Sequence, residues 1–183
     1  MATAILILPI GASLPTDGTS GWPAISILTS SDADTPKARC FIAGFDDTTA
    51  ESLCFGGNLP ANFVSGCTIR GNLYFGDPQS SKYCVMRAAA IVVSPGDAIN
   101  VMGLDPVNIG TGWQSTTVAV AGDYWTGDTS GYVDTFEITL TLSGAAAGDV
   151  FFLIFGRNPA DGSDDAGGDA NVMNELHLEF ETA

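Results

Sequence analysis

The chain has 183 residues, of which 45% are hydrophobic and 15% are charged. This balance excludes an intrinsically disordered chain, because disorder requires low hydrophobicity and high charge, and the length suits one domain with a sizeable core. The net charge of −15 disfavours binding to nucleic acid and to anionic membranes, since both attract basic surfaces. We therefore expect neither of them among the partners.

The first apolar run covers residues 3–8, reads TAILIL and ends at Pro9. It is too short for a stable isolated helix or a membrane span, and it fits a strand that is covered on both faces. No positive charge precedes it, so we do not expect a signal peptide. An uncharged strand of this kind invites pairing with another chain. We therefore expect an interface at Ile5, Leu6, Ile7 and Leu8; the alternative is an ordinary buried strand of the same domain.

Further strands are predicted where apolar residues alternate or cluster between turn residues. These predicted strands are 24–29, 39–45, 51–56, 67–75, 82–93 and 114–120. On the second of them, Phe41, Ala43 and Phe45 are expected to share one face. The two longest, 67–75 and 82–93, are expected to pair with each other around the turn GDPQSS.

Three apolar runs near the C-terminus are separated by turns rich in Gly, Ala and Asp. Residues 136–142 alternate between apolar and polar, which predicts a strand with one solvated face. Residues 150–155 are apolar on both faces, which predicts a central strand of its sheet. Residues 176–180 alternate again, with His177 and Glu179 expected to point outward.

Short strands at regular intervals, separated by many turns and without a convincing helix, are typical of an all-β protein. We predict a single jelly roll or β-sandwich of about eight to nine antiparallel strands. No change in composition marks a linker, so residues 1–183 are expected to form one domain, with 1–23 as a candidate N-terminal arm.

The chain has four cysteines and no CxxC pair. Their apolar surroundings indicate free thiols in a protein made in a reducing cytosol. An even number also permits two disulfides, whose connectivity a sequence does not specify. The disulfide state therefore stays open for Cys40, Cys54, Cys67 and Cys84.

Four segments resemble, in the same order, those of a family of jelly-roll proteins encoded by tailed phages and prophages, commonly near capsid genes. The segments are ESLCF at 51–55, LPANFVSG at 59–66, AAGDV at 146–150 and RNPADGSDDAGGDA at 157–170. The stretch 94–131 departs from the family pattern. The resemblance implies a structural virion protein made in the host cytoplasm. It implies a decoration or cement protein that binds the major capsid protein on the capsid surface as a homotrimer.

Nothing in the sequence indicates an enzyme or a cofactor. A hydrolase triad needs a nucleophile, a base and an orienting group in contact, and the only histidine is His177, on the outward face of a predicted strand. No HExxH, Walker or GxSxG motif is present. We therefore expect no catalytic residue.

The acidic stretch DGSDDAGGD at 161–169 is a weak candidate for binding calcium. It matches the first, third, fifth and ninth positions of an EF-hand loop, but Ala166 and Val172 replace the required Gly and Glu. The alternative is a solvated acidic turn, and Asp123, Asp128 and Asp134 form a weaker candidate. The candidate ligands at 161–169 are Asp161, Ser163, Asp165 and Asp169.

Several aromatic residues are predicted in or beside loops. They can plug the ends of a sandwich, anchor a protein interface, or stack on sugars. The leading hypothesis is therefore a structural virion protein. The alternatives are a carbohydrate- or receptor-binding module and a subunit of a polymeric shell or filament. The aromatic interface candidates are Trp22, Trp113 and Trp125, with Tyr124 beside the last.

Overall fold

In a computed structural model, the chain folds into two antiparallel β-sheets that pack face to face. The structure describes residues 2–15, 21–29, 39–76, 82–96, 114–119, 133–142 and 144–183. Among them are twelve strands and one 3₁₀ turn, η1 (Ile10–Ala12). The strands are β1 (Ala2–Pro9), β2 (Leu14–Pro15), β3 (Ala24–Thr29), β4 (Arg39–Phe45), β5 (Ser52–Asn58), β6 (Phe63–Phe75), β7 (Tyr83–Val93), β8 (Gln114–Ala119), β9 (Asp134–Leu140), β10 (Val150–Arg157), β11 (Ala170–Met173) and β12 (Glu175–Thr182).

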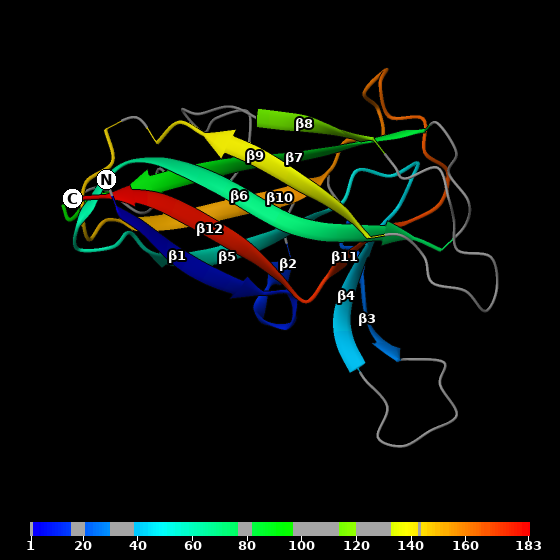
Figure 1. Cartoon of the computed structure of the whole chain (residues 1–183), viewed down its shortest axis with the longest axis horizontal. Coiled ribbons are helices and arrows are strands. Elements are labelled where there is room, and N and C mark those ends of the chain that lie inside the picture. The colour runs from blue at the N-terminus through cyan, green and yellow to red at the C-terminus, as the bar shows by residue number, and fades with distance from the viewer. Residues whose placement is uncertain are drawn as a thin grey trace.

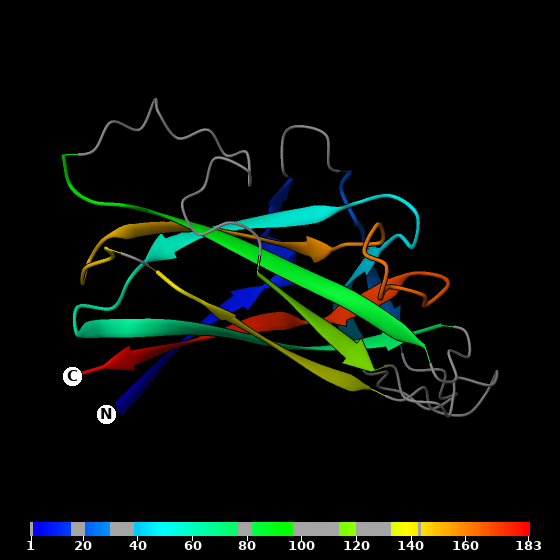
Figure 2. The same cartoon turned by 90° about the horizontal axis from the view of Figure 1, so that it is seen from above.

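The first sheet has seven strands and is built around the long strand β6. One edge of β6 pairs with β9, and the other pairs with β12 over its first part and with β11 over its last part. Beyond them, β1 pairs with β12, while β4 and β3 follow β11 and project from the body of the sandwich (Figure 1). The second sheet has the order β2-β5-β10-β7-β8. Seen from above, orange β10 and red β12 lie in different layers (Figure 2).

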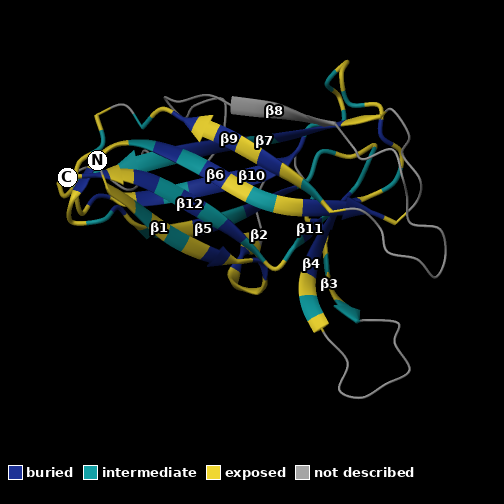
Figure 3. Ribbon diagram, viewed as in Figure 1, coloured by how far each residue is buried: buried dark blue, intermediate teal, exposed yellow. Residues whose placement is uncertain are grey.

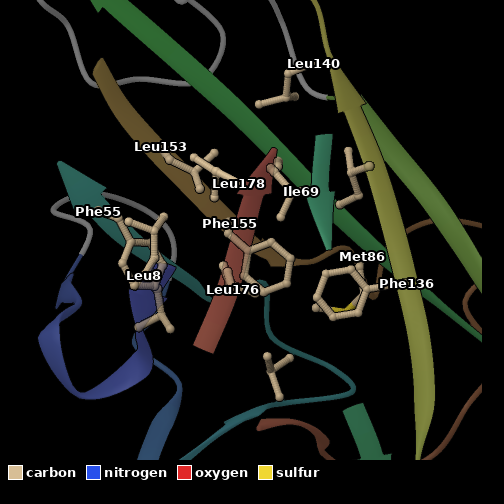
Figure 4. Packing of buried hydrophobic residues seen from close by; sticks show 14 of the residues in the cluster. Leu8, Phe55, Ile69, Met86, Phe136, Leu140, Leu153, Phe155, Leu176 and Leu178 are labelled. Atoms are coloured by element: carbon tan, nitrogen blue, oxygen red, sulfur yellow. The ribbon is translucent and has the colours of Figure 1, made fainter. Parts of the chain in front are cut away.

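The core lies between the two sheets and is filled mainly by aliphatic and aromatic side chains (Figure 4). Phe155 occupies its centre, in edge-to-face contact with Phe45 at 5.6 Å and stacked on Phe136 at 5.2 Å between ring centroids. Burying a side chain of this size contributes roughly 1.5–3 kcal/mol. These contacts hold β4, β9 and β10 together across the layers.

The all-β class and the antiparallel sandwich are confirmed, and so are the three C-terminal strands. β10 is the middle strand of its sheet, as two apolar faces predict. On β9 the buried residues are Phe136, Ile138 and Leu140, and on β12 they are Leu176, Leu178 and Phe180. In the described part of the chain, no helix is long and apolar enough to cross a membrane.

The expected pairing of 67–75 with 82–93 is wrong, because β6 and β7 belong to opposite sheets. β7 is apolar on both faces, so its pattern does not choose its neighbours. Met86 faces the main core, whereas Ala89 packs with Ile154 on the outer side. The strand count was also too low, since β2 and β11 are too short to show a period.

The strand at 39–45 also differs from its predicted pattern. Ala43 and Phe45 are buried, but Phe41 is 49% exposed. Its end of β4 belongs to the part of the hairpin that projects beyond the sandwich (Figure 1). The second sheet therefore does not cover it.

Candidate binding groove on the outer sheet face

A half-open groove of about 540 Å³ lies on the outer face of the seven-stranded sheet. It crosses β9, β6 and β12, which lie side by side in Figure 1. Its polar lining comes from alternate residues of these strands, whose other residues face the core (Figure 3). The polar residues that line it are Arg70, Asn72, Thr135, Glu137, Asn174, Glu175 and His177.

Strand register brings three of these side chains into one row across the sheet. His177 on β12 is opposite Arg70 on β6, and Arg70 is opposite Glu137 on β9. Directly opposed residues of antiparallel strands have Cβ atoms about 4.5–5.5 Å apart. The row therefore presents a basic and an acidic group and an imidazole within reach of one small ligand.

Arg70 is the electrostatic centre of the groove. Its guanidinium donates to the carboxylate of Glu137, and its Nε lies 3.1 Å from Oε2 of Glu179. The hydrogen bond to Glu179 is the main cause that raises the pKa of Arg70, so the group stays charged. Because the side chain is 48% exposed, these pairs are screened by solvent and add little stability. Their effect is to hold the guanidinium in one orientation.

A second pair lies at the end of the groove. Nε2 of His177 is 2.8 Å from Oε1 of Glu175, two residues earlier on the same face of β12. Just before it, Asn174 has a positive φ of 53° and turns the chain from β11 into β12. Its backbone N–H donates to the carbonyl of Phe41 at 2.7 Å, and its carbonyl accepts from Ile10 at 2.8 Å. Backbone bonds from two other elements thus fix this end of the groove.

Gly71 and Phe136 also line the groove, although the Phe136 side chain is only 4% exposed and packs in the core on Phe155. The two residues are opposite each other on β6 and β9. A Cβ at position 71 would overlap the Phe136 ring. The missing side chain therefore lets the Phe136 ring pack in the core directly against β6, which keeps β6 and β9 close together beneath the polar row.

Sequence reasoning found one member of this groove and missed the rest. His177 is on the outward face as predicted, where the sequence indicates a solvated or interface residue rather than a catalytic one. Arg70, Asn72 and Glu137 are outward residues of ordinary alternating strands, which on their own indicate only a solvated face. The groove could be recognised only if β6, β9 and β12 were known to be neighbouring strands. The alternation of apolar and polar residues does not show which strands are neighbours.

The calcium candidates at 161–169 are not gathered around a common point. Among the described residues, no three His, Cys, Asp or Glu side chains lie close enough to hold a metal ion. Asp161 accepts a hydrogen bond from the N–H of Ser163. Asp165 accepts one from the N–H of Tyr83 and lies 3.3 Å from Nζ of Lys82. These two carboxylates thus already have partners within the protein.

The N-terminal interface candidates divide between the two faces of β1. Leu8 is buried and Leu6 packs against the core, whereas Ile5 and Ile7 are 58% and 50% exposed. The expected cover on both faces is therefore present on one face only. Trp22 is also exposed. Trp113 and Trp125 lie outside the described residues.

All four cysteines are free. Cys67 and Cys84 are buried, and burial raises the pKa of each thiol to about 12. Cys40 and Cys54 are half-buried, and their pKa is raised for the same reason. The thiolate is the reactive form, so none of the four is an activated nucleophile.

No protein-family model matches the sequence, and no curated protein matches it. The resemblance to capsid decoration proteins therefore has no support from a sequence family. Among solved structures, the chain is similar to the C-terminal CBM6 of LamC, a marine laminarinase from Zobellia galactanivorans. The identity is 10% and the TM-score 0.45, over 96% of this chain and 98% of that one.

Two further solved structures are similar to this chain. One is TmCBM61 in complex with β-1,4-galactotriose, at 12% identity and a TM-score of 0.36, covering 97% of this chain and 88% of that one. The other is the enzymatically active domain of tailspike protein 4 of bacteriophage CBA120. The identity is 10% and the TM-score 0.34, over 94% of this chain and 19% of that one. At such identities the likeness is one of fold alone, and no residue role is carried over.

Proposed function

We propose that the protein is a non-catalytic β-sandwich module that binds a neutral oligosaccharide in the groove across β9, β6 and β12. The observation that carries the proposal is the row of preassembled polar groups, His177, Arg70 and Glu137, on a rigid sheet. Small-molecule sites commonly have volumes of roughly 300–1,000 Å³ and a few convergent polar groups. The groove fits both descriptions.

The chemistry of the lining suits a sugar. A saccharide presents neighbouring hydroxyls that both donate and accept hydrogen bonds. Guanidinium and amide groups such as those of Arg70 and Asn72 offer two donors or a donor and an acceptor in one plane. Val133, which lines the groove and is 52% exposed, supplies an apolar contact for the C–H groups of a pyranose ring.

The charge of the groove selects against acidic ligands. Glu137 and Glu175 line it together with one arginine, and Glu179 is paired with that arginine from beside it. The whole chain carries a net charge of −15. A sulfated or uronic saccharide would therefore meet repulsion.

Glycan titration by isothermal calorimetry tests the proposal. Neutral oligosaccharides are expected to bind with a Kd between about 1 µM and 1 mM, which corresponds to roughly −8 to −4 kcal/mol. Arg70→Ala should weaken binding at least about tenfold, a loss of about 1.4 kcal/mol. Lys82→Ala is the matched control, because Lys82 is equally exposed and also pairs with a carboxylate, but lies outside the groove. Equal loss in both variants would contradict the proposal.

A structural role in a virion is the second candidate. The observation that favours it is the exposed apolar surface of Ile5 and Ile7 on an edge strand. A decoration protein held on the capsid surface by the major capsid protein would bury that surface as a trimer. Cosedimentation with expanded capsids tests this role, and saturable binding without any response to glycans would favour it over the groove.

A further inference from the structure

Strand β1 forms an open edge of the seven-stranded sheet. It pairs with β12 from Ala2 to Pro9 without a register shift. No other strand pairs with it in the part of the chain that the structure describes. The backbone groups along its other side are therefore a template for a further strand.

This edge lacks the features that usually prevent pairing between molecules. Natural edge strands are blunted by charged side chains, prolines, bulges or short length. Pro9, the last residue of β1, is the one exception, and from Ala2 to Leu8 the sequence is ATAILIL, with no charge and no proline. By contrast, β2 is two residues long and includes Pro15, and β9 carries Asp134 and Glu137.

The two faces of β1 have different surroundings. Leu6 and Leu8 point into the core, so the strand is fixed in place by packing. Ile5 and Ile7 point outward, and at least half of each side chain is exposed. Two isoleucines on one face of an uncharged edge give a new strand apolar area to bury as well as hydrogen bonds to complete.

We propose that β1 pairs antiparallel with β1 of a second copy of this chain, around a twofold axis near Leu6. This register places Ile5 of each copy opposite Ile7 of the other on the outer face. The pairing is self-complementary, as a twofold interface requires. The two seven-stranded sheets then form one continuous sheet across the dimer.

The match of β1 with itself is the reason for choosing a second copy as the occupant, because the exposed Ile5 and Ile7 flank Leu6 and oppose each other in the antiparallel register. Two chains of −15 repel each other over most of their surface, but β1 brings no charged side chain opposite another. Beside the isoleucines, the acidic residue of the same chain is Glu179 on β12, which is opposite Ile5. Three strand spacings, about 14 Å, separate β12 of one copy from β12 of the other, so the two Glu179 side chains lie at least that far apart. This exceeds the Debye length of about 8 Å at physiological ionic strength.

Analytical ultracentrifugation of the full chain tests the proposal, with folding checked by circular dichroism. The wild type is expected to form a dimer that tightens as salt is added, because salt screens the remaining repulsion. Ile5→Lys/Ile7→Lys should raise the dimer Kd at least about tenfold while the monomer stays folded, since both side chains are already exposed. Amide hydrogen exchange should show slowed exchange along β1 that the double variant loses.

Ile27→Lys is the matched control, because Ile27 is 54% exposed on β3, the uncharged strand at the far end of the same sheet. The control is expected to dimerise like the wild type. A monomeric or trimeric wild type, or a dimer lost in Ile27→Lys but kept in the β1 variant, would overturn the proposal. If the β1 variant does not fold, exchange along β1 in the wild type decides alone. Exchange there that does not slow as protein concentration rises would also overturn the proposal.

Discussion

At the scale of single residues, Arg157 organises the acidic loop that had suggested calcium. Its side chain is fully buried and forms a bidentate pair with Asp164, with Nε–Oδ2 at 3.0 Å and Nη2–Oδ1 at 2.7 Å. It also donates to the carbonyl of Gly168 at 2.7 Å. Desolvation lowers the pKa of Arg157, but the hydrogen bonds and charge of Asp164 outweigh it and the pKa is raised. The guanidinium thus supplies, within the chain, the positive charge around which this loop folds.

Removing the guanidinium is expected to be costly. Arg157→Met leaves the buried carboxylate of Asp164 without its countercharge, which typically costs about 3–5 kcal/mol. Urea unfolding measures the loss. The double variant Arg157→Met/Asp164→Leu should be more stable than Arg157→Met alone, because it removes both charges. A double variant that is less stable than Arg157→Met would contradict the view that the unpaired carboxylate of Asp164 causes the loss of stability.

Asp46 gives a pH dependence whose sign follows from its contacts. Its Oδ1 accepts hydrogen bonds from the hydroxyl and N–H of Thr48 and from the N–H of Thr49. The side-chain bond from Thr48 is the largest cause that lowers its pKa from 3.8 to about 2. A lowered pKa in the folded state means that Asp46 stabilises the fold above its unfolded pKa and loses this effect as pH falls.

The difference in unfolding free energy between wild type and Asp46→Ala should therefore be constant near neutral pH. It should shrink as pH falls from about 4 towards 2. Urea titrations at a series of pH values measure it. Thr49→Val retains the carboxylate and these three hydrogen bonds and removes only the Thr49 hydroxyl, the smallest of the causes that lower the pKa of Asp46, so it should stay close to the wild-type pH dependence. A pH-independent difference for Asp46→Ala would contradict this account of the turn.

At the scale of secondary-structure elements, the close contact of β6 with β9 depends on Gly71. A methyl group there would overlap the ring of Phe136 and lie 3.0 Å from Cδ2 of Leu176. Gly71→Ala is expected to cost about 1–3 kcal/mol through overpacking, and the shift that it forces between β6 and β9 should also weaken ligand binding. Gly76→Ala, for which nothing lies within 4 Å, should change neither. Thermal unfolding and glycan titration of the two variants provide the comparison.

Sequence alone predicted those elements whose two faces differ. β9 and β12 each have one solvated face, so their period defined which residues are buried. β6 and β7 were wrongly paired because they are adjacent in sequence, whereas the true partners of β6 come from the last third of the chain. The groove depends on that long-range pairing. The sequence pattern indicated that the residues of the groove point outward, but it did not indicate that they are neighbours of one another.

At the scale of the whole molecule, the acidic charge defines which ligands the groove accepts. With a net charge of −15, acidic oligosaccharides should bind more weakly than neutral ones of the same linkage, and added salt should reduce that difference. Affinity for a neutral sugar should change little with salt. Calorimetry at low and high ionic strength distinguishes these cases. A preference for sulfated or uronic glycans at low salt would run against this charge argument.

The central claim, that the outer face of β6, β9 and β12 is a saccharide site, is tested most directly by amide chemical-shift mapping. The full chain is titrated with a panel of neutral oligosaccharides, and perturbed amides are placed on the fold. The account predicts saturable shifts centred on Arg70, Glu137 and His177, absent in Arg70→Ala and retained in Lys82→Ala. Shifts confined to other surfaces, or none with any sugar at millimolar concentration, would contradict it.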